Sequence, residues 1–206
     1  MKTVPAPFPA LGFDTVMALD AAHAAGLKAA GMSFAIRYLG SITAPELQVI
    51  LDAGLLFMPV TFSRGAGWAP TSGMGLADGE RDVAQLQALN VPKGCTVWVD
   101  LEGVDPTAGF QAVSDWINTR AAILRRAGYD AGLYVGAGDV LNSAELYGLM
   151  NIDRYWRSLS QVPEPSCGFS LLQLPHTITL AGVEIDVDCV QYDFQGRLPT
   201  MVGSGG

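Results

Sequence analysis

Cysteine and histidine are scarce in this chain of 206 residues, and their scarcity excludes several kinds of site. The three cysteines, Cys95, Cys167 and Cys189, are widely spaced and form no CxxC pair, so neither a zinc knuckle nor a disulfide framework is expected. The two histidines, His23 and His176, are too few for most metal centres. We therefore expect no metal, no cofactor and no chemistry that depends on histidine.

Positive charge and long apolar runs are also lacking. Twelve Lys and Arg stand against 20 Asp and Glu, which gives a net charge of −8, and no basic run is present. This balance disfavours nucleic acid and anionic membrane surfaces as partners. No stretch approaches the roughly 18 apolar residues of a membrane-spanning helix, and residues 1–7 lack the apolar core of a signal peptide. We expect no nucleic-acid partner, no membrane insertion and, if the chain is exported, a route without a signal peptide.

The bulk composition is that of a compact globular protein. Half of the residues are hydrophobic, only 16% are charged, and 24 glycines and 12 prolines provide many turns. A chain of this length suits one domain with a sizeable core. We expect a single domain over residues 1–206, with its core at about 10–195 and a loose, flexible C-terminal tail.

Strand-like and helix-like segments alternate along most of the chain. The expected strands lie at 10–15, 33–39, 55–62, 96–103, 131–136, 155–159, 169–174 and 183–190. The expected helices lie at 16–30, 43–53, 80–90 and 107–127, with a short one within 141–150, and a Gly-rich loop is expected from Ser63 to Gly79. Such an order predicts an α/β fold, an irregular TIM-like (β/α) barrel of eight strands whose helices are short or missing in the last third.

The segment at 96–103 has the clearest chemical pattern. Val97, Val99 and Leu101 alternate with Trp98, Asp100 and Glu102, so two carboxyl groups share one face of the strand, with Cα atoms about 6.7 Å apart. Two acids facing one cavity repel each other and lose hydration, which favours a functional role. For a single Asp-x-Glu, two solvated acids at a strand end are an equally good interpretation.

Further acids are expected at the same end of the barrel. Asp14 ends the first strand, and Asp186 lies in the last strand, where Glu184 and Asp188 share its face. Barrel closure makes the first and last strands neighbours, so Asp14 and Asp186 should lie side by side, opposite Asp100 and Glu102. Active sites of β/α barrels occupy this end.

Polar and aromatic residues accompany these acids, as a sugar-binding groove requires. Those expected to contact substrate at strand ends are Arg37, Tyr38, Tyr134, Trp156 and Gln173. Trp68 lies in the Gly-rich loop, where a sugar-stacking lid and a gap-filling side chain are equally good interpretations.

Several short motifs together resemble a known family. These are Gly12-Phe13-Asp14-Thr15, Ile36-Arg-Tyr-Leu-Gly40, the Glu-x6-Ala-Gly-Leu pattern at 46–55, Asp100-x-Glu102, the strand of Gln173, and Val183-Glu-Ile-Asp186-Val. In order and spacing they resemble glycoside hydrolase family 25, and more closely its relatives known as glycoside-hydrolase-like TIM barrels. The resemblance covers roughly residues 10–195.

The resemblance implies an enzyme that cuts the β-1,4 bond after N-acetylmuramic acid in peptidoglycan. It assigns Glu102 as general acid, Asp100 to charge stabilisation or substrate orientation, and Asp14 and Asp186 to site geometry and charge balance. The expected protein is a monomeric endolysin or wall-lytic muramidase that acts on peptidoglycan or a related polysaccharide, in the cell wall or periplasm or as part of a virion. A non-catalytic glycan-binding or virion structural module, and a hydrolase of another polysaccharide, are the alternatives.

Overall fold

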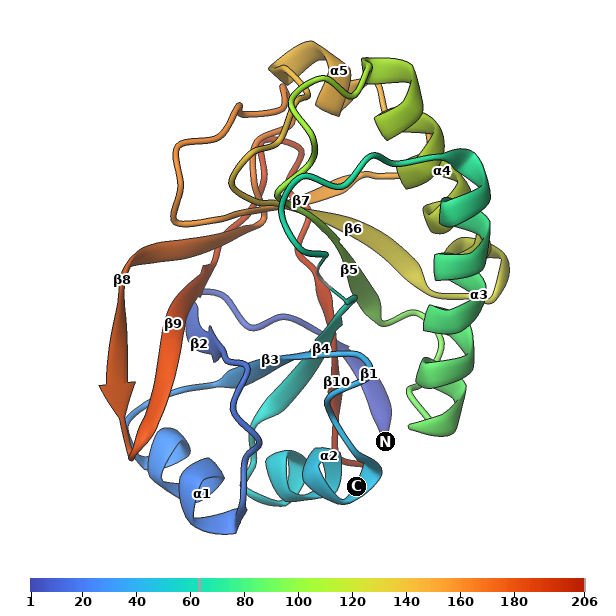
Figure 1. The fold of residues 1–206 in the computed structure, drawn as a ribbon. Coiled ribbons are helices and arrows are strands. Elements are labelled where there is room, and N and C mark those ends of the chain that lie inside the picture. The colour runs from blue at the N-terminus through green and yellow to red at the C-terminus, as the bar shows by residue number, and fades with distance from the viewer. Residues whose placement is uncertain (63, 206) are drawn as a thin grey trace.

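The computed structural model describes residues 1–62 and 64–205 and contains a closed eight-stranded barrel (Figure 1). Its strands are β2 (Ala10–Asp14), β3 (Phe34–Tyr38), β4 (Leu56–Val60), β5 (Thr96–Leu101), β6 (Asp130–Val135), β7 (Arg154–Arg157), β8 (Leu171–Leu180) and β9 (Val183–Val190). They run in the order β4-β3-β2-β9-β8-β7-β6-β5, and pairing between β4 and β5 closes the ring. Only β9 runs antiparallel to its barrel neighbours in the described chain. The predicted irregular barrel is confirmed.

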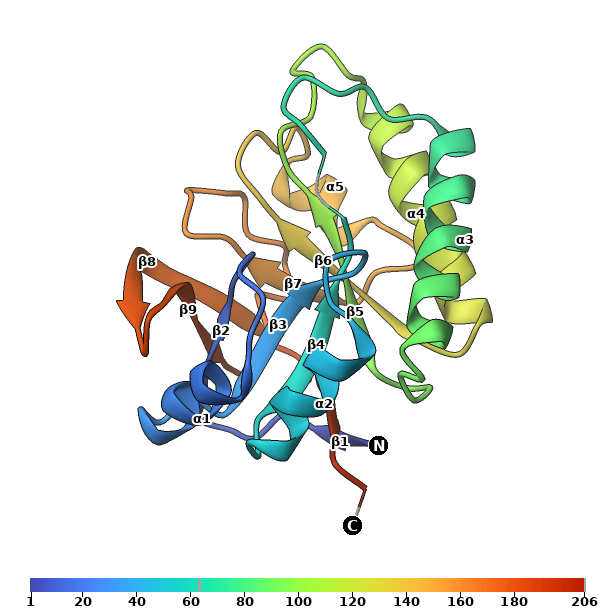
Figure 2. The ribbon, with the colours of Figure 1, turned by 60° about the horizontal axis from the view of Figure 1, so that its bottom comes forward.

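Helices cover the outside of the barrel on two sides. They are α1 (Ala21–Ala29), α2 (Ala44–Asp52), α3 (Ser72–Ala88), α4 (Phe110–Arg126) and the five-residue α5 (Ser143–Tyr147). In Figure 2, α3 and α4 lie together on one flank, whereas α1 and α2 lie beside β3 and β4. Beyond α5 the described residues form no helix, as predicted for the last third. None of the helices in the described chain has the length and apolar character needed to cross a membrane.

The helix α3 corrects the predicted Gly-rich loop. Residue Ser63 lies outside the described residues, but the helix begins at Ser72, where the Thr71 hydroxyl accepts a hydrogen bond from the Met74 N–H group. The glycines that suggested a loop permit close packing on α4. A Cβ atom on Gly75 would lie 2.5 Å from the carbonyl oxygen of Trp116.

The two ends of the chain form a further pair of strands, which the sequence did not predict. Strand β1 (Lys2–Pro5) pairs antiparallel with β10 (Thr200–Gly203), and Val202 of β10 pairs with Phe57 of β4. Met201 and Val202 are fully buried. The predicted flexible tail is therefore wrong for residues 200–203, while Gly206 lies outside the described residues.

Large aromatic side chains fill the interior of the barrel. The rings of Trp98 and Trp156 have centroids 5.9 Å apart, and Tyr134 packs on Trp156 at 4.3 Å. Glycines make room for these rings: a Cβ atom on Gly132 would lie 2.5 Å from the ring of Trp98. These side chains fill the interior of the barrel, so a pocket can form only at its end, beyond the level of the rings.

The close contact between α3 and α4 makes a testable prediction. Replacement of Gly75 by alanine should lower the free energy of unfolding by about 1–3 kcal/mol, because the added methyl group overlaps the α4 backbone. Gly73→Ala is the matched control, since its Cβ would meet nothing closer than 4.0 Å. Urea denaturation would test both variants. Equal stability of the two would contradict this account of the helix contact.

Candidate active site

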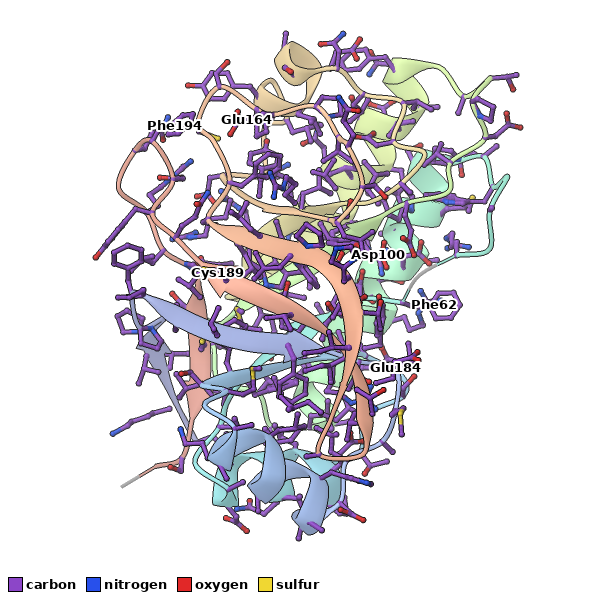
Figure 3. All side chains as sticks on the ribbon, turned by 90° about the vertical axis from the view of Figure 1, so that its left-hand side faces the viewer. Phe62, Asp100, Glu164, Glu184, Cys189 and Phe194 are labelled. Carbon is purple, nitrogen blue, oxygen red and sulfur yellow. The ribbon has the colours of Figure 1, made fainter. Side chains whose placement is uncertain are left out.

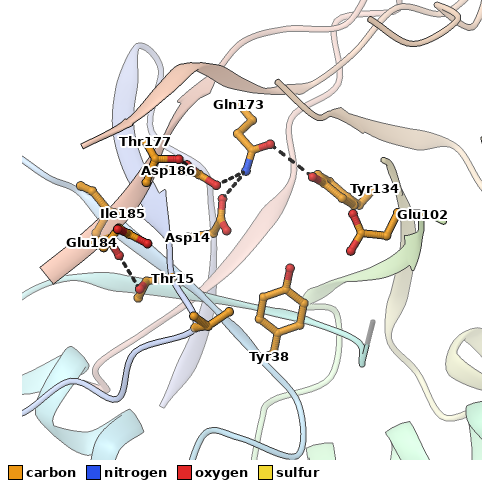
Figure 4. Close-up of a pocket in the computed structure, with 11 residues that line it drawn as sticks. Asp14, Thr15, Tyr38, Glu102, Tyr134, Gln173, Thr177, Glu184, Ile185 and Asp186 are labelled. Carbon is orange, nitrogen blue, oxygen red and sulfur yellow. Dashed lines mark hydrogen bonds between the residues drawn. The ribbon is translucent and has the colours of Figure 1, made fainter. Parts of the chain in front are cut away.

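A pocket of about 220 Å³ opens at the carboxyl ends of the parallel barrel strands and the amino end of the antiparallel β9 (Figure 4). Its lining residues are Asp14, Thr15, Val16, Tyr38, Glu102, Tyr134, Gln173, Thr177, Glu184, Ile185 and Asp186. Six of the residues that the sequence selected are therefore brought together: Asp14, Tyr38, Glu102, Tyr134, Gln173 and Asp186. The loop between β2 and α1 contributes Thr15 and Val16, because α1 begins at Ala21 rather than at residue 16.

The side chain of Gln173 is at the centre of the pocket's hydrogen bonds. Its Nε2 donates to Asp14 Oδ2 at 2.8 Å and to Asp186 Oδ2 at 3.1 Å. Its Oε1 accepts from the Tyr134 hydroxyl at 3.2 Å and from the Leu159 N–H group at 2.9 Å. These four bonds use the full capacity of a carboxamide. Gln173 therefore orients the acids rather than offering a free group to a ligand.

Strand register sets the two acids that Gln173 contacts side by side. Asp14 of β2 pairs directly with Asp186 of β9, as the sequence predicted. An irregularity in β8 between Gln173 and Thr177 lets both residues reach Asp186, and the Thr177 hydroxyl donates to Asp186 Oδ1 at 2.5 Å. Asp186 is thus fixed by two donors from one strand.

Burial changes the protonation of Asp14. Its side chain is buried, and this desolvation, reinforced by the negative charge of Asp186, raises its pKa to about 7 against the opposing hydrogen bond from Gln173. Near neutral pH, Asp14 is therefore a proton-holding group at the edge of the pocket.

Asp188 is an acid of the site that the sequence reasoning missed. It is 0% exposed, lies in the barrel interior next to Asp14, and accepts a hydrogen bond from Trp156 Nε1 at 2.9 Å. Burial and then the charge of Asp14 raise the pKa of Asp188 well above its usual value. The alternation of Glu184, Asp186 and Asp188 on one face of the strand was the signal that could have found it.

Two tyrosines bring hydroxyl groups to the acids. Burial, followed by the negative charge of nearby acids, raises the pKa of Tyr38 and of Tyr134 well above the usual value. Both hydroxyls therefore keep their protons at neutral pH and can donate hydrogen bonds. Figure 4 shows Tyr38 pointing toward the centre of the pocket from below Glu102.

Glu102 follows β5 directly, and two loops hold its backbone. Trp68 Nε1 donates to the Glu102 carbonyl oxygen at 2.8 Å, and the Trp68 ring packs edge-on against Trp116 with centroids 4.8 Å apart. On the other side, a Cβ atom on Gly136 would lie 2.4 Å from Glu102 Cβ, so only glycine allows this approach. Trp68 is not among the pocket-lining residues, which favours the gap-filling interpretation over a sugar-stacking lid.

Besides Trp68, three of the predicted site residues lie away from the pocket lining. Arg37 is 1% exposed; its Nε donates to Glu46 Oε1 at 2.7 Å and its Nη1 to the carbonyl oxygen of Thr15. Trp156 and Asp100 are both buried among the side chains that fill the barrel. Arg37 lies on the face of its strand opposite Tyr38. Asp100 and Trp156 are buried behind the lining, where the charge of Asp100 still contributes, after burial, to the raised pKa of Tyr38 and of Tyr134.

The described part of the chain contains no group of three or more His, Cys, Asp or Glu side chains arranged to hold a metal ion. The pocket instead combines carboxyl groups, tyrosine hydroxyls and an apolar rim. Such a set can transfer a proton and bind a polar, hydroxyl-rich ligand.

Comparison with known proteins identifies similar folds. Residues 25–170 match the family described as Rv2525c-like, glycoside hydrolase-like domain. The Tat-secreted protein Rv2525c of Mycobacterium tuberculosis, solved with L-tartrate, has a TM-score of 0.67 and 17% identity over 88% of this chain and 95% of its own. A lysozyme from Streptomyces coelicolor has a TM-score of 0.62 and 16% identity, covering 88% of this chain and 92% of the lysozyme.

The modular autolysin LytC of Streptococcus pneumoniae, solved with a synthetic peptidoglycan ligand, has a TM-score of 0.65 and 13% identity. The similar region covers 91% of this chain and 48% of LytC. None of the curated protein sequences matches the chain. At these identities the structural likeness establishes the fold.

The raised pKa of Asp14 predicts a pH-dependent stability. Between about pH 4 and pH 7 the folded protein retains a proton on Asp14 that the unfolded chain has lost, so the free energy of unfolding should fall as pH rises through this window. Asp14→Asn should remove this part of the slope, whereas Glu184→Gln, on the exposed rim of the pocket, should keep it. Urea denaturation across the window would measure the slopes. The same slope in Asp14→Asn as in the wild type would contradict the burial argument.

Proposed function

The chain belongs to the Rv2525c-like glycoside hydrolase-like family, and on this premise we propose that it hydrolyses the β-1,4 bond between N-acetylmuramic acid and N-acetylglucosamine in peptidoglycan. The observation that carries the proposal is the position of Glu102. Its partly exposed carboxyl group lines the pocket, across from the Asp14 and Asp186 carboxyl groups that Gln173 holds (Figure 4). The fold shared with a lysozyme and an autolysin supports the same reaction class.

In this mechanism Glu102 is the general acid. It donates its proton to the glycosidic oxygen as the bond to the anomeric carbon breaks, and positive charge then develops on the sugar ring. Asp186 faces this charge, held in place by Gln173 and Thr177. Asp14, which keeps its proton up to about pH 7, limits the negative charge that gathers around the substrate. Asp100 is buried, but its charge contributes, after burial of the ring, to the raised pKa of Tyr38, and we assign it to charge stabilisation from behind the pocket lining.

Substrate binding is assigned to the tyrosines rather than to all of the predicted aromatic residues. Tyr38 and Tyr134 line the pocket and keep their hydroxyl protons. Tyr38 can donate its proton to a sugar oxygen, whereas the Tyr134 hydroxyl donates to Gln173 Oε1 and can accept a hydrogen bond from a sugar hydroxyl; both rings offer apolar faces. Trp68 positions Glu102 by donating a hydrogen bond to its carbonyl oxygen. Arg37 pairs with Glu46, and Trp156 packs on Trp98 inside the barrel, so neither is assigned to substrate binding.

We place this activity at the cell wall. Among the proteins of similar fold, one is described as Tat-secreted and another as an autolysin with a peptidoglycan ligand. The carboxyl and hydroxyl groups of the pocket suit the hydroxyl and amide groups of a glycan strand.

A second candidate function is glycan binding without hydrolysis. The observation that favours it is the burial of Asp100, which is 3% exposed and is not among the residues that line the pocket with Glu102. Under this alternative the acids would serve recognition only.

Replacement of Glu102 by glutamine separates these two functions. Glu102→Gln should lower the rate of fragment release from dye-labelled peptidoglycan by at least about 10²-fold, because the amide cannot donate the catalytic proton. Glu184→Gln is the matched control, since Glu184 lines the same pocket but is exposed at its rim, and it should keep the rate within a few-fold. Circular dichroism would establish that both variants are folded. An unchanged rate in Glu102→Gln would refute the assignment, and a wild type that binds peptidoglycan without cutting it would favour the second candidate.

A further inference from the structure

A second hollow adjoins the acidic pocket on the far side of Glu102. It has a volume of about 280 Å³ and is lined by Val16, Tyr38, Ser41, Phe62 and Glu102. Val16, Tyr38 and Glu102 also line the acidic pocket, so the two hollows are continuous. Glu102 therefore lies on the boundary between them.

The chemistry of the two hollows differs. Four of the residues lining the acidic pocket are acids, whereas in the second hollow Glu102 is the one acid among the lining residues, and the described lining includes no basic group. Phe62 is 52% exposed and lies two residues beyond the end of β4, and Val16 is also exposed. An exposed aromatic ring with a neighbouring serine hydroxyl suits an uncharged sugar ring, which has apolar C–H faces and polar edges.

The ring of Phe62 is in contact with a neighbouring charged side chain. The guanidinium group of Arg81 lies 5.7 Å from the centroid of the Phe62 ring, and Arg81 Nη2 lies 3.0 Å from Asp78 Oδ1. Figure 3 shows Phe62 projecting from the molecule on the same side as Glu184, while Phe194 lies at a distant corner. A half-exposed aromatic ring of this kind offers an apolar face to a ligand.

We infer that this second hollow binds the sugar that leaves during cleavage, an uncharged N-acetylhexosamine ring seated against Phe62. The inference rests on the proposed function, because a general acid must contact the glycosidic oxygen that joins two sugars. Asp14 and Asp186 lie on one side of Glu102, so the sugar that develops positive charge belongs there. The other sugar must then occupy the side of Phe62 and Ser41.

This assignment gives a balanced reaction. The Glu102 carboxyl proton moves to the glycosidic oxygen, the bond from that oxygen to the anomeric carbon breaks, and the sugar on Phe62 leaves with a new 4-hydroxyl group. Water adds to the anomeric carbon, and its spare proton returns to Glu102.

Binding to the inactive Glu102→Gln variant tests the inference. The probe is the tetrasaccharide of alternating N-acetylglucosamine and N-acetylmuramic acid, which is long enough to span both hollows. Adding Phe62→Ala should weaken its affinity by about twofold to tenfold, the range expected for the loss of one aromatic contact. Adding Phe194→Ala, which removes a 73% exposed aromatic ring outside both hollows, should leave the affinity unchanged. Titration calorimetry would measure all three.

Kinetics of the active enzyme test which side the leaving sugar takes. The glycosyl fluoride of the N-acetylglucosamine–N-acetylmuramic acid disaccharide has a leaving group too small to reach Phe62. In Phe62→Ala, kcat/KM should therefore fall more for the tetrasaccharide than for the fluoride. An equal fall for both substrates would place Phe62 on the other side of the cleaved bond and overturn the inference.

The possible results separate this inference from the proposed function. Tetrasaccharide binding that Phe62→Ala leaves unchanged would overturn the leaving-sugar site alone. Failure of the tetrasaccharide to bind Glu102→Gln or to be cut by the wild type would overturn the proposed function, and the inference with it. Weakened binding in Phe62→Ala but not in Phe194→Ala, together with the selective loss of tetrasaccharide cleavage, would support both.

Discussion

The carboxamide of Gln173 joins three strands at the mouth of the barrel, and the pocket depends on it. It donates to Asp14 on β2 and to Asp186 on β9, and it accepts from Tyr134 on β6. Without these donors, nothing in the contact would offset the repulsion between the Asp14 and Asp186 carboxyl groups when both are ionised. The irregularity in β8 next to Gln173 and the antiparallel direction of β9 bring these groups together. The pairing of β9 with β2 and β8 therefore also sets which groups meet in the pocket.

The position of Glu102 depends on packing outside the barrel. Trp68 holds the Glu102 carbonyl oxygen and rests on Trp116 of α4. The Trp116 indole in turn donates to Asp78 Oδ2 at 3.0 Å, and Arg64, from the same loop as Trp68, is paired with Asp78 at 2.5 Å. The loop is thereby fixed to the helix pair α3 and α4. A side chain that must meet a glycosidic oxygen needs such support, because small displacements of a catalytic group cost much of its effect.

Strand order and the pairing of Asp14 with Asp186 could be predicted, because barrel closure makes the first and last strands neighbours. How deep a side chain lies within the barrel could not be predicted, because period-2 alternation tells which face of a strand a side chain occupies but not its distance from the barrel end. Asp100 shares a face with the pocket but is buried below it. The error at Arg37 was avoidable: adjacent residues of a strand point to opposite faces, so Arg37 and Tyr38 could not both line one pocket. The helix α3 was missed because glycines that permit helix contact look like loop residues in a single sequence.

The central claim is that Glu102 and the acids held by Gln173 form a site that cleaves peptidoglycan after N-acetylmuramic acid. The most direct measurement is the identity of the sugar at the newly formed reducing ends. Purified peptidoglycan would be digested, the soluble fragments reduced with borohydride, and the reduced end sugar identified by mass spectrometry. The account predicts N-acetylmuramitol at these ends. N-acetylglucosaminitol at the ends, or no soluble fragments from the folded wild-type protein, would contradict it.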